Sequence, residues 1–392
     1  MKQSILRSGS VAISSNAAGL VCSGPEFFEV LEREINAAEK EIHFQSYILK
    51  WDATGQRIIA ALQKASVKGV RISLLLDAYG SHELEEDILR KELGPKVELR
   101  FFGPFFSNGK LHIGRRLHHK VAVFDSRVAV VGGINISDAY RGDPNNPPWL
   151  DFAVRIEGVA AEALKRHCER IWHGRIHELR NRKKNAWSKS LSKANARIRP
   201  VRNDFLRNRH EVAATYRRAL RTAGKHIDLV SGYFLPGRRI RMLIKMATRR
   251  GVRIRIVISE KSDVAVARLA REYLYAWLIR NGIEIYEYLP SNVHGKVLAV
   301  DGNFTSIGSY DLNNLSTYSN IELNINVLDE AFNQKFTEVF EKTIKNDCTR
   351  VTAETLRKRG GLYRKTKCWL AYRVTKTLFF ISYLMAGEAE NG

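Results

Sequence analysis

Short apolar runs alternate with amphipathic segments along the chain, and the order of these segments is repeated in its two halves. In the first half, the pattern over 32–49 predicts a helix followed by a short strand, and 68–77 predicts a buried strand. Segments 214–235 and 250–259 repeat that order in the second half. Strands that alternate with helices indicate an α/β fold with largely buried central sheets. A repeat of this long period indicates two duplicated domains rather than a solenoid.

Two further segments, 263–281 and 329–346, carry apolar residues at steps of three and four and are predicted to be helices. A basic segment at 176–209 separates the halves, and it is either a solvated linker or a surface that faces phosphate. The pattern therefore divides the chain into a first lobe (1–175), a basic linker (176–209), a second lobe (210–350) and a C-terminal tail (351–392).

The C-terminal tail mixes aromatic with basic side chains. Its segment 364–386 contains Trp369 and Phe379 beside Arg373 and Lys376. Because charged residues interrupt the apolar run, the segment is not predicted to span a bilayer. It is predicted either to lie among lipid headgroups or to pack as a helix on the lobes, and the sequence leaves both possibilities open.

Composition limits the class of protein and of partner. The chain has 392 residues, enough for two domains with their own cores, and 44% of them are hydrophobic. Lys and Arg number 64 against 41 Asp and Glu, and the net charge of +23 favours nucleic acid or an anionic membrane surface as partner. Four widely spaced cysteines indicate neither a zinc site nor a disulfide framework, and they favour a reducing, cytoplasmic setting. We expect neither a signal peptide nor a membrane span.

One polar motif, H-x-K-x4-D, occurs once in each half, embedded in apolar residues that predict a buried strand. A Gly-containing turn follows both copies at the same distance, GGIN at 132–135 and GSYD at 308–311. Alternate residues of a strand share a face, so the His and Lys of each copy point together. Two copies with identical spacing indicate one active site shared between two similar lobes. The motif residues are His118, Lys120 and Asp125 in the first copy, and His294, Lys296 and Asp301 in the second.

These residue types suit phosphoryl transfer. A histidine acts as nucleophile or general acid near neutral pH, and a lysine ammonium binds a phosphate oxygen. Asn135, in the first turn, can donate an amide hydrogen to another oxygen. Neither half alone supplies a nucleophile and an acid on opposite sides of phosphorus. Two facing lobes supply both, and this chemistry requires no metal ion and no other cofactor.

The motifs and turns resemble those of the phospholipase D superfamily, whose mark is two H-x-K-x4-D motifs, each followed by G-[GS]-x-N. The resemblance implies an α/β fold with two pseudo-symmetric phospholipase D-like lobes, each a mixed β-sheet flanked by helices, sharing one active-site cleft. It also implies a covalent phosphohistidine intermediate, with His118 and His294 as nucleophile and acid/base in either order. Lys120, Lys296 and Asn135 are implied to bind phosphate.

The same resemblance implies roles for four carboxylates. Asp125 and Asp301 belong to the catalytic motif, and we expect them to organise it rather than to touch the substrate. An acidic residue after each motif is expected to orient the histidine of the other lobe. Asp151 and Glu322 stand at the positions where that residue belongs.

The second turn departs from the family pattern. Asp311 stands where the family has Asn, and Asn313 follows two residues later, as though the pair had exchanged. An ionised carboxylate cannot donate to a phosphate oxygen and would repel it. Either Asn313 takes over the substrate-binding role, or nearby cations hold Asp311 and the second phosphate contact is weaker.

Several strings resemble bacterial cardiolipin synthases of the short form that lacks N-terminal membrane spans. They include FQSYILKWDATG (44–55), GGINISDAYRG (132–142), WLDFAVRIEG (149–158) and GSYDLNNLSTYSNIELN (308–324). The resemblance implies a phosphatidyl transferase that forms cardiolipin from phosphatidylglycerol or a related phospholipid. Anionic phospholipids and the membrane surface are then the expected partners, at the cytoplasmic face of the cell membrane as a peripheral protein. Nucleic acid is the less favoured partner, and the sequence does not indicate an oligomeric state.

Two other functions fit the same residues. One is a phospholipase D-type phosphodiesterase that acts on phospholipid or nucleic acid, which the two-histidine chemistry and the positive charge would both serve. The other is a non-catalytic protein that binds anionic membranes, which the exchange at Asp311 would allow. The form of the cleft discriminates between lipid and nucleic acid, since a lipid enzyme needs an apolar approach to the site.

Overall fold

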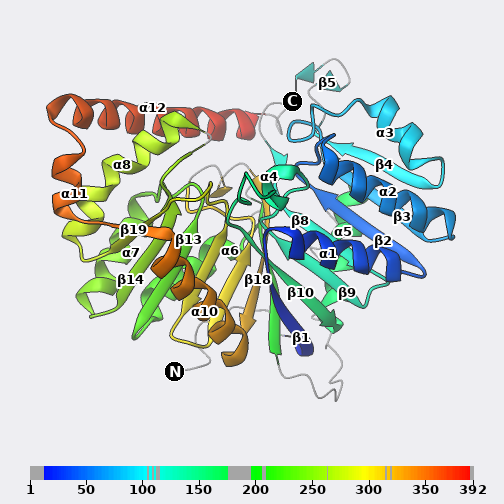
Figure 1. Cartoon of the computed structure of the whole chain (residues 1–392), viewed down its shortest axis with the longest axis horizontal. Coiled ribbons are helices and arrows are strands. Elements are labelled where there is room, and N and C mark those ends of the chain that lie inside the picture. The colour runs from blue at the N-terminus through cyan, green and yellow to red at the C-terminus, as the bar shows by residue number, and fades with distance from the viewer. Residues whose placement is uncertain are drawn as a thin grey trace.

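The computed structural model describes residues 13–103, 106–107, 110–111, 115–174, 196–204, 209–262, 264–313, 316–317 and 320–388. The strands of the first half are β1 (Ile13–Cys22), β2 (Glu41–Ser46), β3 (Arg71–Asp77), β4 (Val97–Phe102), β8 (Lys120–Phe124), β9 (Val128–Gly132) and β10 (Phe152–Gly158). Its helices are α1 (Pro25–Ala37), α2 (Ala53–Val67), α3 (Glu86–Leu93), α4 (Asp138–Arg141) and α5 (Val159–Trp172). These strands form a mixed sheet with the order β4-β3-β2-β8-β9-β10-β1, in which β2, β3 and β4 are parallel and the others antiparallel (Figure 1).

The second half repeats this arrangement. Its strands are β11 (Ala196–Asp204), β13 (His226–Ser231), β14 (Arg253–Ser259), β15 (Glu284–Tyr288), β16 (Lys296–Val300), β17 (Phe304–Gly308) and β18 (Asn320–Leu328). Its helices are α6 (Glu211–Thr222), α7 (Arg238–Arg249), α8 (Ala265–Arg280) and α10 (Glu330–Asp347). The strand order β15-β14-β13-β16-β17-β18-β11 matches that of the first half strand for strand, with the same three parallel strands at one end.

The described chain contains further elements. They are the strands β5 (Phe106–Ser107), β6 (Lys110–Leu111), β7 (Arg116–Leu117), β12 (Arg209–His210) and β19 (Cys348–Val351), and the helices α11 (Ala353–Lys358) and α12 (Leu362–Glu388). None of the helices in the described part of the chain is both long and apolar enough to cross a bilayer.

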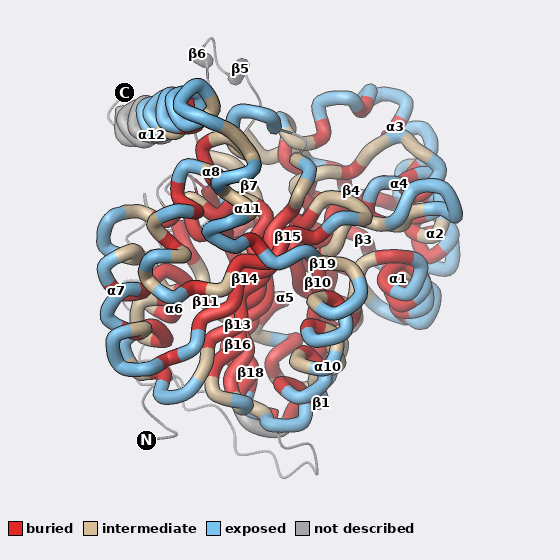
Figure 2. Tube along the Cα trace, turned by 60° about the vertical axis from the view of Figure 1, so that its left-hand side comes forward, coloured by how far each residue is buried: buried red, intermediate tan, exposed pale blue. Residues whose placement is uncertain are grey.

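The two halves join through backbone pairing and through a shared apolar core. β1 pairs antiparallel with β11, where Ile13 lies opposite Ile198, and this pairing makes one continuous sheet. Each half also has its own apolar core, and a third apolar cluster contains Val121 and Phe152 from the first half with Val297 from the second. The motif strands β8 and β16 are buried along their whole length, as Figure 2 shows for the centre of the molecule, because they lie within this core. The predicted α/β fold with two lobes of mixed sheet is confirmed.

The predicted helices at 263–281 and 329–346 are confirmed as α8 and α10. The prediction of a linker over 176–209 differs from the structure at its C-terminal end, where Ala196–Asp204 is strand β11 between β1 and β18. The alternating arginines of this segment suggest a solvated chain, but Ile198 and Val201 between them are fully buried. Residues 175–195 lie outside the described residues. We infer that β11 belongs to the second lobe, because it takes the place at the end of that sheet that β1 takes in the first.

Candidate active site

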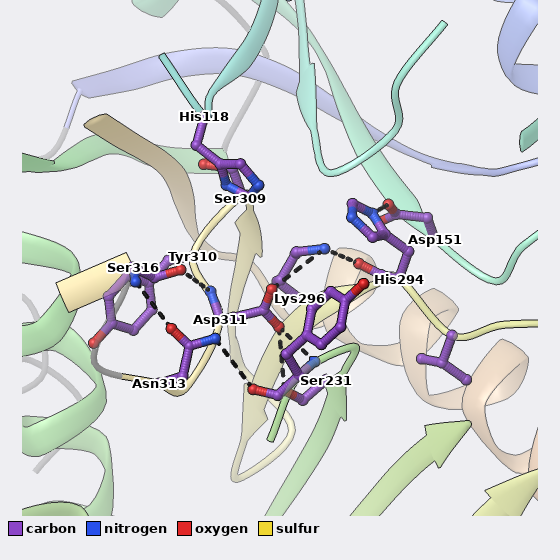
Figure 3. Close-up of polar contacts among 12 residues, drawn as sticks. His118, Asp151, Ser231, His294, Lys296, Ser309, Tyr310, Asp311, Asn313 and Ser316 are labelled. Atoms are coloured by element: carbon purple, nitrogen blue, oxygen red, sulfur yellow. Dashed lines mark hydrogen bonds and ion pairs between the residues drawn. The ribbon is translucent and has the colours of Figure 1, made fainter. Parts of the chain in front are cut away.

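The two motif histidines stand just before the equivalent strands β8 and β16 of the two halves, and they line one cavity. The cavity has a volume of about 1120 Å³ and is lined by His118, His294, Asn135, Asp311 and Asn313, among other residues. In Figure 3 the imidazoles of His118 and His294 come from different sides of the site, with Lys296 and Asp311 lower and between them. The structure thus brings together residues that are far apart in the chain, such as His118 and Asn313, which are separated by 313 − 118 = 195 positions.

Each histidine is held by a carboxylate from the other half. His118 Nδ1 lies 3.0 Å from Glu322 Oε2, and Glu322 is on β18. His294 Nδ1 lies 2.7 Å from Asp151 Oδ2, and Asp151 directly precedes β10. Both carboxylates are fully buried, and both contacts leave the opposite ring nitrogen, Nε2, free of the carboxylate. Because of this crossed arrangement, the orientation of each histidine ring depends on a carboxylate from the other half of the chain.

The two carboxylates differ in their surroundings. Glu322 accepts hydrogen bonds from the hydroxyl of Ser309 and from Asn320 Nδ2, the latter at 3.2 Å. Burial alone would raise the pKa of Glu322, but the neighbouring His118 and the hydroxyl of Ser309 hold it below its ordinary value. Gly133, the counterpart of Ser309 in the first turn, brings no hydroxyl, and a Cβ there would lie 2.4 Å from Asp151 Oδ1.

Asp151 has fewer donors around it. Within the described residues, its Oδ1 accepts the backbone N–H of Phe152 at 2.7 Å, and its Oδ2 meets His294. Burial raises the pKa of Asp151 to about 7, and the negative charge of Asp311 adds to that rise. The Glu322 carboxyl is therefore ionised at neutral pH, whereas Asp151 retains a proton up to about neutrality.

Burial also affects the histidines and one lysine. It lowers the pKa of His118 and lowers that of His294 well below its ordinary value, so both imidazoles are neutral at pH 7. Lys120 Nζ donates to the carbonyl of His118 at 2.7 Å, and Lys296 Nζ donates to the carbonyl of His294. Burial and the charge of Lys296 lower the pKa of Lys120 to about 7. Both lysines are buried, and each ammonium contacts the backbone of its own motif histidine.

The turns after the motifs carry the remaining predicted site residues. Asn135 Oδ1 accepts the N–H of Ile48 at 3.2 Å, and Asp311 Oδ1 accepts the N–H of Tyr233 at 3.0 Å. Asn135 and Asp311 thus occupy equivalent places, each holding the loop that follows β2 or β13. The other polar atom of each side chain has a different partner. Asn135 Nδ2 donates to Tyr140 Oη at 2.7 Å, whereas Asp311 Oδ2 lies 3.6 Å from Lys296 Nζ.

Of the two explanations for the Asp311 exchange, the contacts favour a carboxylate held by a nearby cation. Asn313 does not replace the missing amide at the same place. Its Nδ2 donates to the carbonyl of Tyr233 at 3.4 Å, and its Oδ1 accepts the N–H of Ser316 at 2.9 Å. Asn313 therefore supports the loop around Tyr233 while still lining the cavity.

The motif aspartates lie away from the cavity and hold turns. Asp125 accepts the backbone N–H groups of Glu39, Lys40 and Glu41 at 2.8, 2.8 and 2.9 Å. Asp301 accepts three equivalent N–H groups, from Gly224, Lys225 and His226. Both aspartates have a positive φ of 50°, which a following turn requires. They fix the end of each motif strand against the strand beside it.

Ser309 and Tyr140 belong to the site but were not predicted from the sequence. Ser309 binds Glu322, and Tyr140 packs its ring 5.3 Å from that of His294. Tyr47 packs its ring 4.8 Å from that of His118. A signal existed for Ser309 and Tyr140, because each lies within a string that carries a motif turn. Among the described residues, no group of three His, Cys, Asp or Glu side chains has a geometry that could hold a metal ion.

The chain has two similar α/β halves, and each half brings the histidine of its H-x-K-x4-D motif to the same cavity. This combination defines a phospholipase D-like enzyme. Comparison with protein families matches residues 31–146 and 216–344 to the family described as "Cardiolipin synthase, PLD-like domain". The chain belongs to this family of cardiolipin synthases with a phospholipase D-like domain.

Individual relatives agree with this assignment. Cardiolipin synthase B of Salmonella typhi is 30% identical over 368 residues, which cover 91% of this chain and 87% of that protein. A cardiolipin synthase of Clostridium perfringens is 30% identical over 356 residues, covering 89% and 74% of the two chains. Among solved structures, the phosphatidylserine synthase of Haemophilus influenzae Rd KW20 superimposes with a TM-score of 0.71 at 14% identity, over 96% of this chain and 97% of that chain. This structural match supports the fold.

Proposed function

We propose that the protein transfers a phosphatidyl group between two molecules of phosphatidylglycerol, or of a related anionic glycerophospholipid, and so forms cardiolipin and glycerol. The observation that carries this proposal is the pair of histidines in one cavity, each held at Nδ1 by a carboxylate from the other half. Family membership supports the choice of phosphatidyl transfer over other phosphodiester chemistry.

The reaction proceeds in two displacements at phosphorus. His118 Nε2 attacks phosphorus, and the bond from phosphorus to the glycerol oxygen breaks. The Nε2 proton of His294 passes to that oxygen while the protonated Asp151 gives its own proton to Nδ1 of His294. The hydroxyl of the second lipid then returns a proton to His294 and attacks the phosphohistidine, and the phosphorus–nitrogen bond breaks. Lys120, Lys296 and Asn135 offset the negative charge on the phosphoryl oxygens during both steps.

The unequal carboxylates support His118 as the nucleophile. An ionised Glu322 accepts the Nδ1–H of His118, which leaves a lone pair on Nε2 for attack. A protonated Asp151 donates to Nδ1 of His294, which places the hydrogen of that ring on Nε2, where an acid needs it. The extra hydroxyl at Ser309 accordingly favours attack by the first histidine and proton transfer by the second.

The lining of the cavity supports a lipid substrate. Apolar and aromatic side chains stand beside the polar floor, and they include Ile48, Tyr79, Trp149, Leu235, Val264 and Leu378. Such a lining accommodates the glycerol and the first part of acyl chains, and it limits the access of water that would turn transfer into hydrolysis. We infer that the enzyme acts as a peripheral protein on the cytoplasmic face of the cell membrane.

The test is an incubation of the purified protein with vesicles of phosphatidylglycerol, followed by mass analysis of the products. The wild type is expected to yield cardiolipin and glycerol, and His118→Ala and His294→Ala are expected to lose at least about a thousandfold of that activity. Brief reaction with phosphorus-labelled lipid is expected to leave label on the peptide that contains His118. Phosphatidic acid as the product would indicate hydrolysis, and the absence of any product from folded protein would refute the proposal.

A further inference from the structure

Helix α12 is fixed on the second half by one face only. The inward residues Cys368, Ala371 and Thr375 are buried, and α12 packs along α8, where the rings of Tyr372 and Tyr273 lie 4.8 Å apart. The spacing of the inward residues, at steps of three and four, is that of one helix face. Figure 1 shows α12 running along the edge of the molecule above α8 and toward the middle, where the halves meet.

Ion pairs hold this helix and the segment before it in place. Arg364, in the first turn of α12, forms a two-pronged pair with Glu272 on α8, at 2.8 to 3.1 Å. Arg359, just after α11, pairs through both of its terminal nitrogens with Glu287, which also accepts the hydroxyl of Tyr275 at 2.9 Å. The orientation of α12 about its own axis is therefore set by buried carboxylates, and its outer face is a fixed surface.

The outer face carries an apolar stripe that ends at the active-site cavity. Leu370, Val374 and Leu378 are four residues apart and have exposed fractions of 56%, 43% and 55%. Leu378, the last of the three, lines the cavity that contains the two histidines. Val264 and Val266, before and within the first turn of α8, are also exposed and line the same cavity. Exposed apolar side chains thus lead from the outside of α12 to the reacting groups.

Basic and aromatic side chains accompany this stripe. Lys365, Lys367, Arg373 and Lys376 are all exposed on α12, as the tube in Figure 2 shows for the outer side of the helix. The ammonium of Lys367 lies 4.6 Å from the ring centre of Tyr363, and Trp369 is 47% exposed. In the described part of α12, basic side chains outnumber acidic ones on this surface. Helices with apolar and aromatic residues flanked by Lys and Arg bind the boundary between headgroups and acyl chains of anionic bilayers.

We propose that the outer face of α12, together with the start of α8, is the surface on which the protein docks to a bilayer of anionic phospholipid, and that the stripe Leu370–Val374–Leu378 guides the lipid into the cavity. This inference rests on the proposed function for the identity of the lipid. It adds the element that touches the membrane and the path of the substrate. The partner of this surface is the bilayer itself, because the basic side chains of α12 match anionic headgroups and its exposed apolar side chains match the acyl region.

The experiment compares two double variants of the full chain. Leu370→Glu/Val374→Glu places two carboxylates on the stripe. Met242→Glu/Met246→Glu is the matched control, since these methionines are also four residues apart, have exposed fractions of 54% and 47%, and lie on α7 away from the cavity lining. Flotation with vesicles of phosphatidylglycerol or phosphatidylcholine measures binding, and His118→Ala is included to separate binding from catalysis.

Wild type, the methionine control and His118→Ala are expected to float with phosphatidylglycerol vesicles and to be released by high salt. The stripe variant is expected to lose about tenfold or more of that binding, because two charges would have to enter the acyl boundary. On dispersed, short-chain phosphatidylglycerol the stripe variant is expected to keep its turnover, while on vesicles its turnover falls with its binding.

The outcomes separate the two proposals. If the stripe variant binds and turns over vesicles like the methionine control, α12 is not the docking surface. If it still floats with the vesicles but loses activity on dispersed lipid, while circular dichroism shows an intact fold, α12 belongs to the substrate cavity alone and the docking proposal fails. If wild type binds the vesicles through α12 but forms no product from either lipid, the proposed function fails and the docking surface stands.

Discussion

The replacement Asp311→Asn tests how the second half of the site balances its charge. The new amide keeps the oxygen that accepts the N–H of Tyr233 at 3.0 Å, and it exchanges the second oxygen, 3.6 Å from Lys296 Nζ, for a donor. The result is the chemistry that Asn135 already has in the first half. The variant therefore removes one negative charge from the site while the shape of the turn is kept.

The magnitude follows from the distance. Two unit charges 3.6 Å apart in a partly polar interior, with an effective dielectric constant near 20, interact by about 4–5 kcal/mol. A phosphate on the far side of the ammonium would lie roughly 6–7 Å from the carboxylate, where repulsion amounts to about 2–3 kcal/mol. Part of this gain is offset because the buried ammonium of Lys296 loses its counter-ion. We expect substrate binding to improve by about 1–2 kcal/mol, which is roughly a tenfold lower KM.

The same change weakens the fold. Breaking a buried ion pair leaves one charge without a partner, and we expect the free energy of unfolding to fall by about 3 kcal/mol. The assay is the initial rate of cardiolipin formation against phosphatidylglycerol concentration in detergent micelles, with urea unfolding measured in parallel. Asp311→Ala is the control, because it removes the acceptor of the Tyr233 N–H as well and is expected to lose both stability and activity.

A KM for Asp311→Asn that is unchanged or higher, in protein that is still folded, would refute the electrostatic reasoning. It would mean that the carboxylate does not oppose the phosphate. The Asp311→Asn/Asn313→Asp double variant then shows whether the position of the charge matters, since it moves the carboxylate by two residues and keeps the net charge of the site.

Three further predictions follow from the same contacts. We expect kcat/KM to fall above about pH 7 for two reasons. Asp151, whose pKa is raised to about 7, then loses its proton, and Lys120, whose pKa is lowered to about 7, becomes neutral. A value of kcat/KM that still rises at pH 9 would contradict this. Ser309→Ala removes a donor that lowers the pKa of Glu322, so the acidic limb of the kcat/KM profile is expected to move to higher pH, and an unmoved limb would show that the hydroxyl is not needed. Asp125→Ala is expected to lower the free energy of unfolding by about 2–3 kcal/mol in urea, since three backbone N–H groups lose their acceptor, and a change below about 0.5 kcal/mol would contradict this.

Local pattern accounts for the motif strands and for the order of the elements. The apolar runs after Lys120 and Lys296 are bounded by turns, and both form fully buried strands. Pattern fails at β11, because this strand contains three arginines, and one of them, Arg199, is itself buried. It also cannot pair His118 with Glu322, which lie 204 residues apart, since periodicity carries no information on long-range contacts. That pairing was expected from family resemblance alone, and the packing of α12 on α8 was one of two possibilities left open.

Two of the differences between the halves of the site lie in the turn that follows the motif, and both act in the same direction. Ser309 in place of Gly133 gives Glu322 a hydrogen-bond donor and so helps to keep the partner of His118 ionised. Asp311 in place of Asn135 adds a negative charge that raises the pKa of Asp151, the partner of His294. One turn, Gly308–Asp311, therefore makes Nε2 of His118 a better nucleophile and helps the pair of His294 and Asp151 to retain a proton. Duplication of one lobe would by itself give two imidazoles with equivalent surroundings. The reaction needs one histidine as nucleophile and the other as acid, and the differences in the second turn give the two histidines these different roles.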